Sequence, residues 1–241
     1  MSPPGLPKGE DRTAQHEGTA VSRPTRRRHW LIASLRAALI PSLLLSARAA
    51  RSDAREDFFK SIELDNVQLL RPLLEGGFDP NTTDERGNPG LLVALRDGSF
   101  EAAELLLSAK QIQVDKANSV GETALMMAAL RGQANWVGRL LDRGAAINRT
   151  GWTPLHYGAS GPEPKVLTLL LGRGARLEAT STNGTTPLMM AAGYGAMDGA
   201  DLLLARGADP RRRNERGLNA ADFARRAGRD ALAGRLEAPV R

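Results

Sequence analysis

Residues 50–241 of this 241-residue chain offer few of the side chains that catalysis requires. The chain has no cysteine, and His156 is the only histidine after residue 49. A catalytic triad, a zinc site and a cysteine nucleophile therefore lack their partners. Two carboxylate pairs stand three residues apart, Asp198 with Asp201 and Glu101 with Glu104, but such pairs normally lie on solvated helix faces. No phosphate-binding glycine loop is present. We expect no enzyme activity, no cofactor and no metal site.

The single histidine stands in a short pattern that recurs along the chain. Thr153-Pro154-Leu155-His156-Tyr157-Gly158-Ala159 follows Gly151, and related starts occur at Thr123 and Thr186. Threonine can cap a helix and proline suits its first turn, so each start predicts a helix. An apolar run that ends at a glycine follows each start and predicts a second helix. The terminating glycines are Gly144, Gly174 and Gly207, and a similar apolar run ends at Gly77.

The repeat period indicates the fold class. A glycine stands two residues before the threonine position at steps of 34, 30, 33 and 33 residues. This T-P-L-H pattern with its period resembles the ankyrin-repeat family, whose units are a β-turn and two antiparallel helices. The resemblance implies an all-α solenoid of about six helix-turn-helix units with short β-turn fingers, each unit burying its apolar face against its neighbours. The glycines are Gly87, Gly121, Gly151, Gly184 and Gly217.

The pattern divides the chain after residue 49 into six units. The two terminal units lack the Thr-Pro start and are expected to be capping repeats, because one face of each meets water. The units are 53–83 (N-terminal capping repeat), 84–117, 118–147, 148–180, 181–213 and 214–238 (C-terminal capping repeat).

Three units are irregular. In 84–117, Pro89-Gly90 takes the Thr-Pro position and Lys110 takes the glycine position, with one extra residue before the next unit. Three residues are missing before Gly151, which predicts a truncated finger. Residues 161–164 read as an insertion between the helices of the fourth unit. We expect the first two irregularities, which are neighbours, to distort the array near its middle.

The pattern also predicts which side chains face inward. Leu69 falls in the apolar stripe of the first unit, and Trp136 is expected in the core. One residue of each pair Met126-Met127 and Met189-Met190 should be buried, since the pairs recur at the same helix position. Arg229 and the other arginines of the last unit are expected to face solvent.

The positive charge of the chain is concentrated at its ends. The formal net charge is +6 and the calculated isoelectric point is about 10.3. Residues 1–49 hold 8 basic against 3 acidic residues, which leaves 25 basic against 24 acidic residues in the rest of the chain. This near neutrality argues against nucleic-acid binding. Residues 206–241 carry 10 arginines against 5 acidic residues. This excess of arginine predicts a solvated capping surface; the alternative is contact with an acidic partner or anionic lipid.

The N-terminal 49 residues predict an export signal. Arg26-Arg27-Arg28 precedes a mostly apolar run at 30–45, and a small-x-small sequence ends at Ala49. This order is typical of a secretory signal peptide cut after Ala49, preceded here by a disordered n-region. The apolar run is interrupted and too short to span a bilayer, which takes about 20 residues.

Three alternatives for this segment remain open. Arg27-Arg28 also resembles a twin-arginine signal, although we favour Sec export. An uncleaved segment would anchor the protein at a membrane instead. The n-region is long, and Val21 is an alternative start to Met1.

The family resemblance implies where a partner binds. Ankyrin proteins generally bind other proteins through the finger tips and the exposed edges of the first helices. Trp152 is the strongest candidate, because exposed tryptophans are typical hot-spot residues; the alternative is packing against the neighbouring finger or Tyr157. The resemblance gives His156 a structural role, hydrogen-bonded to its threonine. The partner-binding candidates are Trp152, Tyr157, Tyr194, Arg96, Asp97, Glu122, Arg131, Arg213 and Arg216.

These observations predict a non-enzymatic protein-protein interaction module that is exported to a bacterial periplasm or secreted. The excess of 28 arginines over 5 lysines supports a bacterial source. By resemblance, such proteins support an envelope enzyme, for instance one that removes peroxide. The alternatives are an immunity-type inhibitor of a toxic effector and a membrane-tethered scaffold. We expect one protein partner, no nucleic acid and a monomer.

Overall fold

The computed structural model describes residues 52–238, which form helices joined by turns and loops. The predicted signal peptide and its cleavage site lie outside the described residues. The first described helix covers residues 52–63. The helices that follow are α2 (Val67–Glu75), α3 (Gly90–Asp97), α4 (Phe100–Ser108), α5 (Ala124–Leu130), α6 (Ala134–Asp142), α7 (Pro154–Ser160), α8 (Pro164–Gly172), α9 (Pro187–Tyr194), α10 (Met197–Ala205), α11 (Ala220–Arg226) and α12 (Asp230–Glu237).

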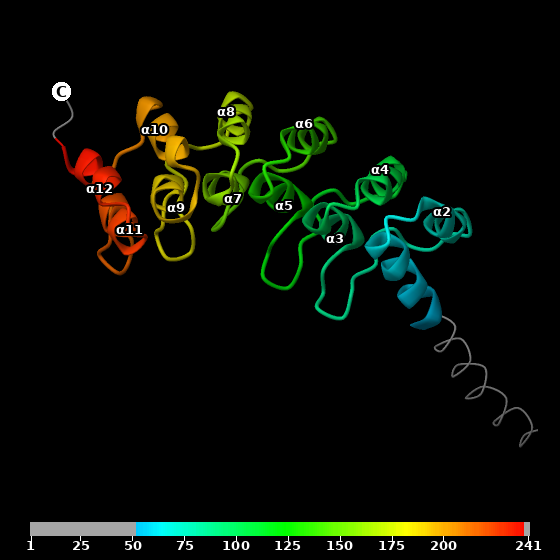
Figure 1. The fold of residues 1–241 in the computed structure, drawn as a ribbon. Helices are drawn as coiled ribbons and strands as arrows, with labels where there is room; N and C mark the ends of the chain where they lie inside the picture. The colour runs from blue at the N-terminus through cyan, green and yellow to red at the C-terminus, as the bar shows by residue number, and fades with distance from the viewer. Residues whose placement is uncertain (1–51, 239–241) are drawn as a thin grey trace, which may run out of the picture. The chain divides into compact units, whose positions relative to one another are not determined.

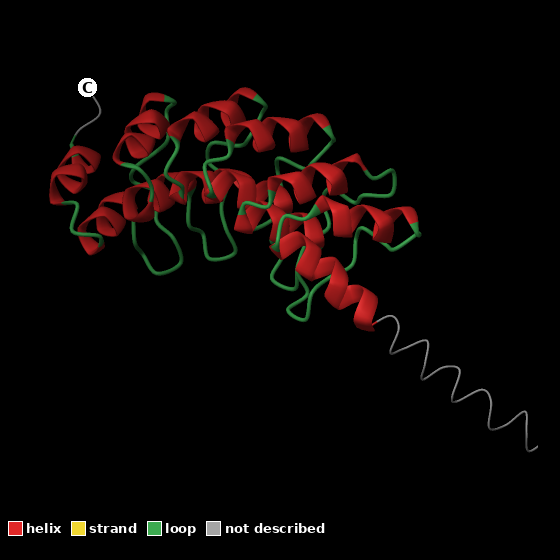
Figure 2. Cartoon of the chain, turned by 45° about the vertical axis from the view of Figure 1, so that its right-hand side comes forward, coloured by secondary structure: helices red, strands yellow, loops and turns green. Residues whose placement is uncertain are grey.

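These helices lie in two rows (Figures 1 and 2). The inner row consists of α3, α5, α7, α9 and α11, and each of these helices packs against the next in sequence. The outer row consists of α2, α4, α6, α8, α10 and α12, and each of the last five packs against the inner helix that precedes it. Long loops project from the inner row, away from the outer one (Figure 1). The predicted all-α solenoid of stacked helix pairs is confirmed.

One continuous apolar core runs between the two rows. Leu155 and Ala159, four residues apart in α7, are buried, and α5 and α9 bury the same leucine and alanine positions. Burying one leucine contributes about 1.5–3 kcal/mol. The alanines are small enough to let consecutive inner helices approach closely. Each unit therefore depends on its neighbours for its core.

The helix starts follow the sequence pattern. Thr123 and Thr186 each accept a hydrogen bond from the backbone N–H three residues on, at 3.4 and 3.3 Å. In the last unit, Asn219 and Asp222 replace this cap with a reciprocal pair. The Asp222 N–H donates to Asn219 Oδ1 at 3.0 Å, and the Asn219 N–H donates to Asp222 Oδ2 at 2.9 Å.

The loops between helix pairs show the predicted irregularities. They have 14 residues after α2, α8 and α10, 15 after α4 and 11 after α6. In the long loops a backbone N–H donates to a carbonyl four residues on, as from Asp84 to Asn88 at 2.9 Å. In the short loop, the Asn148 side chain instead donates to Gly174 O at 2.9 Å, in the loop of the next unit. The backbones of α4 and α6 also approach each other less closely than those of α6 and α8.

The predicted insertion at residues 161–164 is wrong. The link from α7 to α8 is residues 161–163, the same length as the link 131–133 between α5 and α6. Pro164 is the first residue of α8, a position where its missing N–H is not needed. Glu163 caps the helix by accepting from the Lys165 N–H at 3.1 Å.

Three predictions of side-chain direction are also wrong. Leu69 is 53% exposed. For the first methionine pair the prediction is wrong, because Met126 and Met127 are both buried, whereas for the second pair it is confirmed, since only Met189 is buried. Arg229 turns inward, and its Nη1 donates to the Gly195 carbonyl at 2.8 Å and to the carbonyls of Ala191 and Ala192. Arg229 thus supplies a donor to the carbonyls at the end of α9, where helix carbonyls lack partners from a following turn.

The turn after α9 provides a test of how tightly the units stack. A Cβ atom at Gly195 would lie 2.0 Å from the Ala159 carbonyl oxygen of the preceding unit. We predict that Gly195→Ala lowers the free energy of unfolding in urea by roughly 1–3 kcal/mol, because the backbone must shift to relieve the overlap. Gly234→Ala is the control, since a Cβ there meets nothing within 4 Å. Equal stability of the two variants would contradict this packing.

Candidate functional site

Two adjoining hollows lie on the inner row, between α7, α9 and α11. The first, which we call the aromatic hollow, has a volume of about 440 Å³. The second, the arginine hollow, has a volume of about 350 Å³ and includes Arg216, Phe223 and Arg226 in its wall. Trp152 and Tyr194 line both. The full lining of the aromatic hollow is Leu130, Trp152, His156, Tyr157, Ser160, Met190 and Tyr194.

Trp152 both packs and remains accessible. It follows Gly151, whose φ of +78° turns the loop just before α7. Its ring meets the His156 ring edge to face, with centroids 5.3 Å apart and planes at 72°. Since Trp152 is only partly buried and lines both hollows, packing on His156 fixes a side chain that can still contact a partner.

His156 holds the floor of the aromatic hollow in place. Its Nε2 lies 2.9 Å from the Thr185 carbonyl oxygen, in the next unit. A carbonyl can only accept, so Nε2 carries the hydrogen and Nδ1 accepts from Thr153, whose N and Oγ1 lie 3.2 and 2.9 Å away. Burial lowers the pKa of His156, although the bond to Thr185 opposes this. The predicted structural role is confirmed.

Tyr157 and Glu122, both predicted partner contacts, bind each other. The Tyr157 hydroxyl donates to Glu122 Oε1 at 2.9 Å, and Asn118 Nδ2 donates to Glu122 Oε2 at 2.8 Å. Burial and the adjacent Glu122 carboxylate raise the pKa of the Tyr157 hydroxyl. Tyr157 therefore offers its ring to the hollow, while its hydroxyl is already satisfied.

Tyr194 is the most exposed aromatic residue of the two hollows. It is the last residue of α9 and is 64% exposed. Its ring meets Phe223 of α11 edge to face, with centroids 6.5 Å apart. The hollows therefore extend over three consecutive inner helices, α7, α9 and α11.

Five predicted candidates lie outside both linings, and Glu122 is one of them. Arg96 pairs with Asp97 through two contacts of 2.7 and 2.8 Å. Arg131 is exposed at the end of α5. Arg213 donates to the Gly217 carbonyl at 2.5 Å and lies 3.7 Å from an Asp222 oxygen. Of the predicted basic candidates, the structure brings only Arg216 into the site.

Sequence reasoning missed other residues of the site. Phe223 and Arg226 stand three apart in α11 and share one face of it, a spacing that was available from the sequence. Met190 lines both hollows. The sequence alone does not predict how α11 is oriented against α9, and this orientation places Phe223 against Tyr194.

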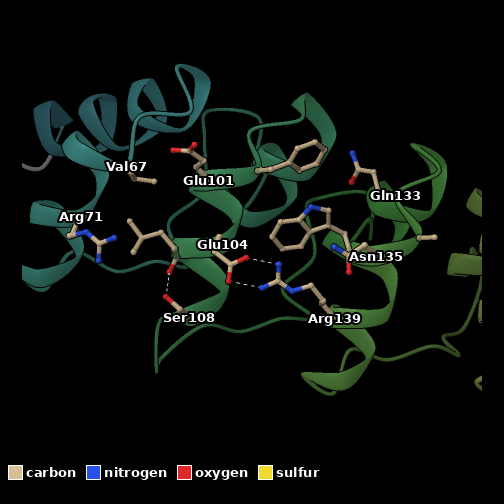
Figure 3. A pocket seen from close by; sticks show the side chains of 12 residues that line it. Val67, Arg71, Glu101, Glu104, Ser108, Gln133, Asn135 and Arg139 are labelled. Carbon is tan, nitrogen blue, oxygen red and sulfur yellow. Dashed lines mark hydrogen bonds and ion pairs between the residues drawn. The ribbon is translucent and has the colours of Figure 1, made fainter.

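A separate groove of about 830 Å³ lies on the outer row, along α2, α4 and α6 (Figure 3). We call it the outer groove. Phe100, 43% exposed, stacks on Trp136 with ring centroids 6.0 Å apart. The Arg139 guanidinium lies 4.4 Å above the Trp136 ring and pairs with Glu104, whose pKa that hydrogen bond lowers. Trp136 is buried, as predicted, and these charged groups already satisfy each other.

No group of three or more potential metal ligands occurs within residues 52–238. In the same part of the chain, no helix has both the length and the apolar character needed to cross a membrane.

The sequence matches the family described as "Ankyrin repeats (3 copies)" over residues 58–150, 94–181 and 137–214. It is 31% identical over 151 residues to the nuclear factor NF-kappa-B p105 subunit of Gallus gallus, across 60% of this chain and 15% of that protein. It is 32% identical over 96 residues to protein phosphatase 1 regulatory subunit 27 of Mus musculus, across 39% of this chain and 62% of that protein. The match thus spans less than two thirds of either relative.

A solved structure shows a similar arrangement over more of the chain. The complex of the Bd0816 predatory endopeptidase from Bdellovibrio bacteriovorus with the immunity protein Bd3460 contains a chain that superposes with a TM-score of 0.62. The two chains are 25% identical, and the superposition covers 74% of this chain and 97% of that one.

The neutral, buried His156 gives a prediction for pH. A pKa lowered on folding means that the unfolded chain binds the proton more readily, so stability is full above the ordinary value of 6.5 and falls as the pH drops below it. We predict that His156→Gln lowers the free energy of unfolding by roughly 1–3 kcal/mol at pH 7.5 through the lost hydrogen bonds. The variant should also lose less stability than the parent between pH 7 and pH 5. His16 and His29 are common to both proteins, so identical pH dependence would contradict this role for His156.

Proposed function

Because the chain belongs to the ankyrin-repeat family, we propose that it binds a protein partner through the two adjoining hollows on its inner row. The observation that carries this proposal is Tyr194. It is a large aromatic side chain, 64% exposed, beside Trp152 and above two hollows. Aromatic anchors of this kind supply most of the binding energy in protein interfaces, since they bury much area at little entropic cost.

The surroundings of these aromatics favour a rigid contact surface. Trp152 is fixed by the His156 ring, and His156 is fixed by Thr185 of the next unit. These side chains are therefore already ordered before a partner binds, which lowers the conformational entropy lost on association. No catalytic group takes part in the proposed role.

We further propose that the module acts after export, in a bacterial cell envelope. Support comes from residues 1–49, where three arginines, an apolar run and a small-x-small sequence follow one another. In that compartment the module would bind and support an envelope enzyme. A membrane-tethered scaffold, with the segment retained, is the alternative.

The likeness to a chain of the peptidase–immunity complex favours a second candidate function. In that case the partner is a peptidase and the chain is its inhibitor. The two candidates differ in the effect of binding. An inhibitor lowers the rate of the captured enzyme, whereas a support factor maintains or raises that rate.

The two surfaces can be compared with matched aromatic truncations. We predict that Tyr194→Ala weakens partner capture from envelope extracts by about tenfold or more, the loss typical of an interface anchor. Phe100→Ala, which removes an exposed aromatic from the outer groove, should leave capture unchanged. Thermal unfolding of both variants checks that they remain folded. Loss of capture with Phe100→Ala and retention with Tyr194→Ala would overturn the proposal.

The enzymatic activity of the captured partner then distinguishes the support factor from the inhibitor. Purified chain is added to the partner while substrate turnover is followed. Lower turnover that Tyr194→Ala restores identifies an inhibitor, and unchanged or higher turnover identifies a support factor.

Export is tested by the mass of the mature protein. We predict a chain that begins at Ala50 when the protein is purified from its host and analysed by intact mass spectrometry. A protein that retains residues 30–45 and fractionates with membranes would support the tethered scaffold instead.

A further inference from the structure

The aromatic and arginine hollows adjoin, and we call the two together the trough. Trp152, Met190 and Tyr194 stand in the walls of both. The trough therefore extends over α7, α9 and α11, and the two hollows are close enough for one extended segment to reach both.

The aromatic end of the trough has apolar surface to offer. The polar groups of His156, Tyr157 and Ser160 are engaged within the chain. Both nitrogens of His156 are bonded, the Tyr157 hydroxyl donates to Glu122, and Ser160 Oγ donates to the His156 carbonyl at 3.1 Å. What remains accessible is largely carbon, from Leu130, Trp152 and the other side chains of the wall. This end is suited to a large apolar side chain, whose burial is favourable without a polar partner.

The arginine end has the opposite character. Arg216 and Arg226 are exposed, and neither forms an ion pair among the described residues. Their neighbours Arg213 and Arg225, by contrast, both pair with Asp222. No carboxylate belongs to the wall of the arginine hollow. Guanidinium groups pair well with carboxylates, often through two parallel hydrogen bonds.

We infer that the trough binds an extended protein segment that carries a large apolar side chain followed, toward α11, by acidic residues. The apolar side chain enters the aromatic hollow, and the carboxylates pair with Arg216 and Arg226. This inference rests on the proposed function and specifies the chemistry of the partner.

One charge beside the trough favours one direction of the segment. The Glu122 carboxylate accepts the Tyr157 hydroxyl at the aromatic end. A segment with its acidic residues on the other side of the anchor would bring carboxylates toward Glu122. Like charges repel, so the order of anchor and acid matters.

Three fluorescein-labelled peptides test the inference with the full chain. The first carries tryptophan followed by two glutamates in a Gly-Ser background, the second replaces the glutamates by glutamines, and the third replaces the tryptophan by alanine. By fluorescence anisotropy we expect saturable binding of the first, about three- to tenfold weaker binding of the second, and more than about tenfold weaker binding of the third.

A pair of double variants assigns the acidic preference. Arg216→Ala with Arg226→Ala should bind the glutamate and glutamine peptides equally. Arg143→Ala with Arg206→Ala removes the same charge from exposed positions at the ends of α6 and α10, and should bind like the parent.

Two outcomes would overturn the inference: no saturable binding of the glutamate peptide, or an unchanged preference in the Arg216/Arg226 variant. Either leaves the proposed function standing, because a folded partner can still require Tyr194. Loss of Tyr194 dependence in partner capture overturns both.

Discussion

The packing of each inner helix against the next is the interaction on which the rest of the structure depends. No unit has a core of its own, so Leu155, Ala159 and their counterparts are buried only because a neighbour covers them. Small residues set the spacing. At Gly193 a Cβ atom would lie 3.2 Å from Phe223 of α11, and at Gly195 it would overlap the preceding unit. The same close packing gives α7, α9 and α11 the fixed spacing from which the trough is made.

Hydrogen bonds between neighbouring units supplement this apolar packing and fix how the units are oriented. His156 reaches the Thr185 carbonyl of the following loop, and Arg229 caps the end of α9 from the last unit. Each contact satisfies a buried or terminal backbone group that would otherwise cost free energy. The loop that carries Trp152 is therefore tied to His156 of α7 and, through it, to the loop that precedes α9, which is why a partly exposed aromatic at this position can be rigid.

Features that arise within one unit could be predicted from the sequence. Thr186 before Pro187, or Leu155 four residues before Ala159, specifies a helix start and a buried face by itself, and the glycine period counts the units. Features that depend on how neighbouring units are oriented could not be predicted from the sequence. Arg229 was expected in solvent because its acceptors lie in another unit. The outer groove was missed for the same reason, since Phe100 and Trp136 meet only across α4 and α6. In the trough, Trp152 and Arg216 followed from their positions in the loops, whereas Arg226 depends on the orientation of α11.

The central claim is that the inner row presents a preformed surface for a protein, and amide hydrogen exchange with and without the captured partner tests it most directly. The account predicts added protection in residues 150–160, 185–195 and 214–227. It also predicts that α4 and α6, which carry the outer groove, exchange at the same rate in both states, and that α7 and α9 are already protected in the free chain. Added protection confined to α4 and α6, or slow exchange in α7 and α9 that appears only when the partner is bound, would contradict it.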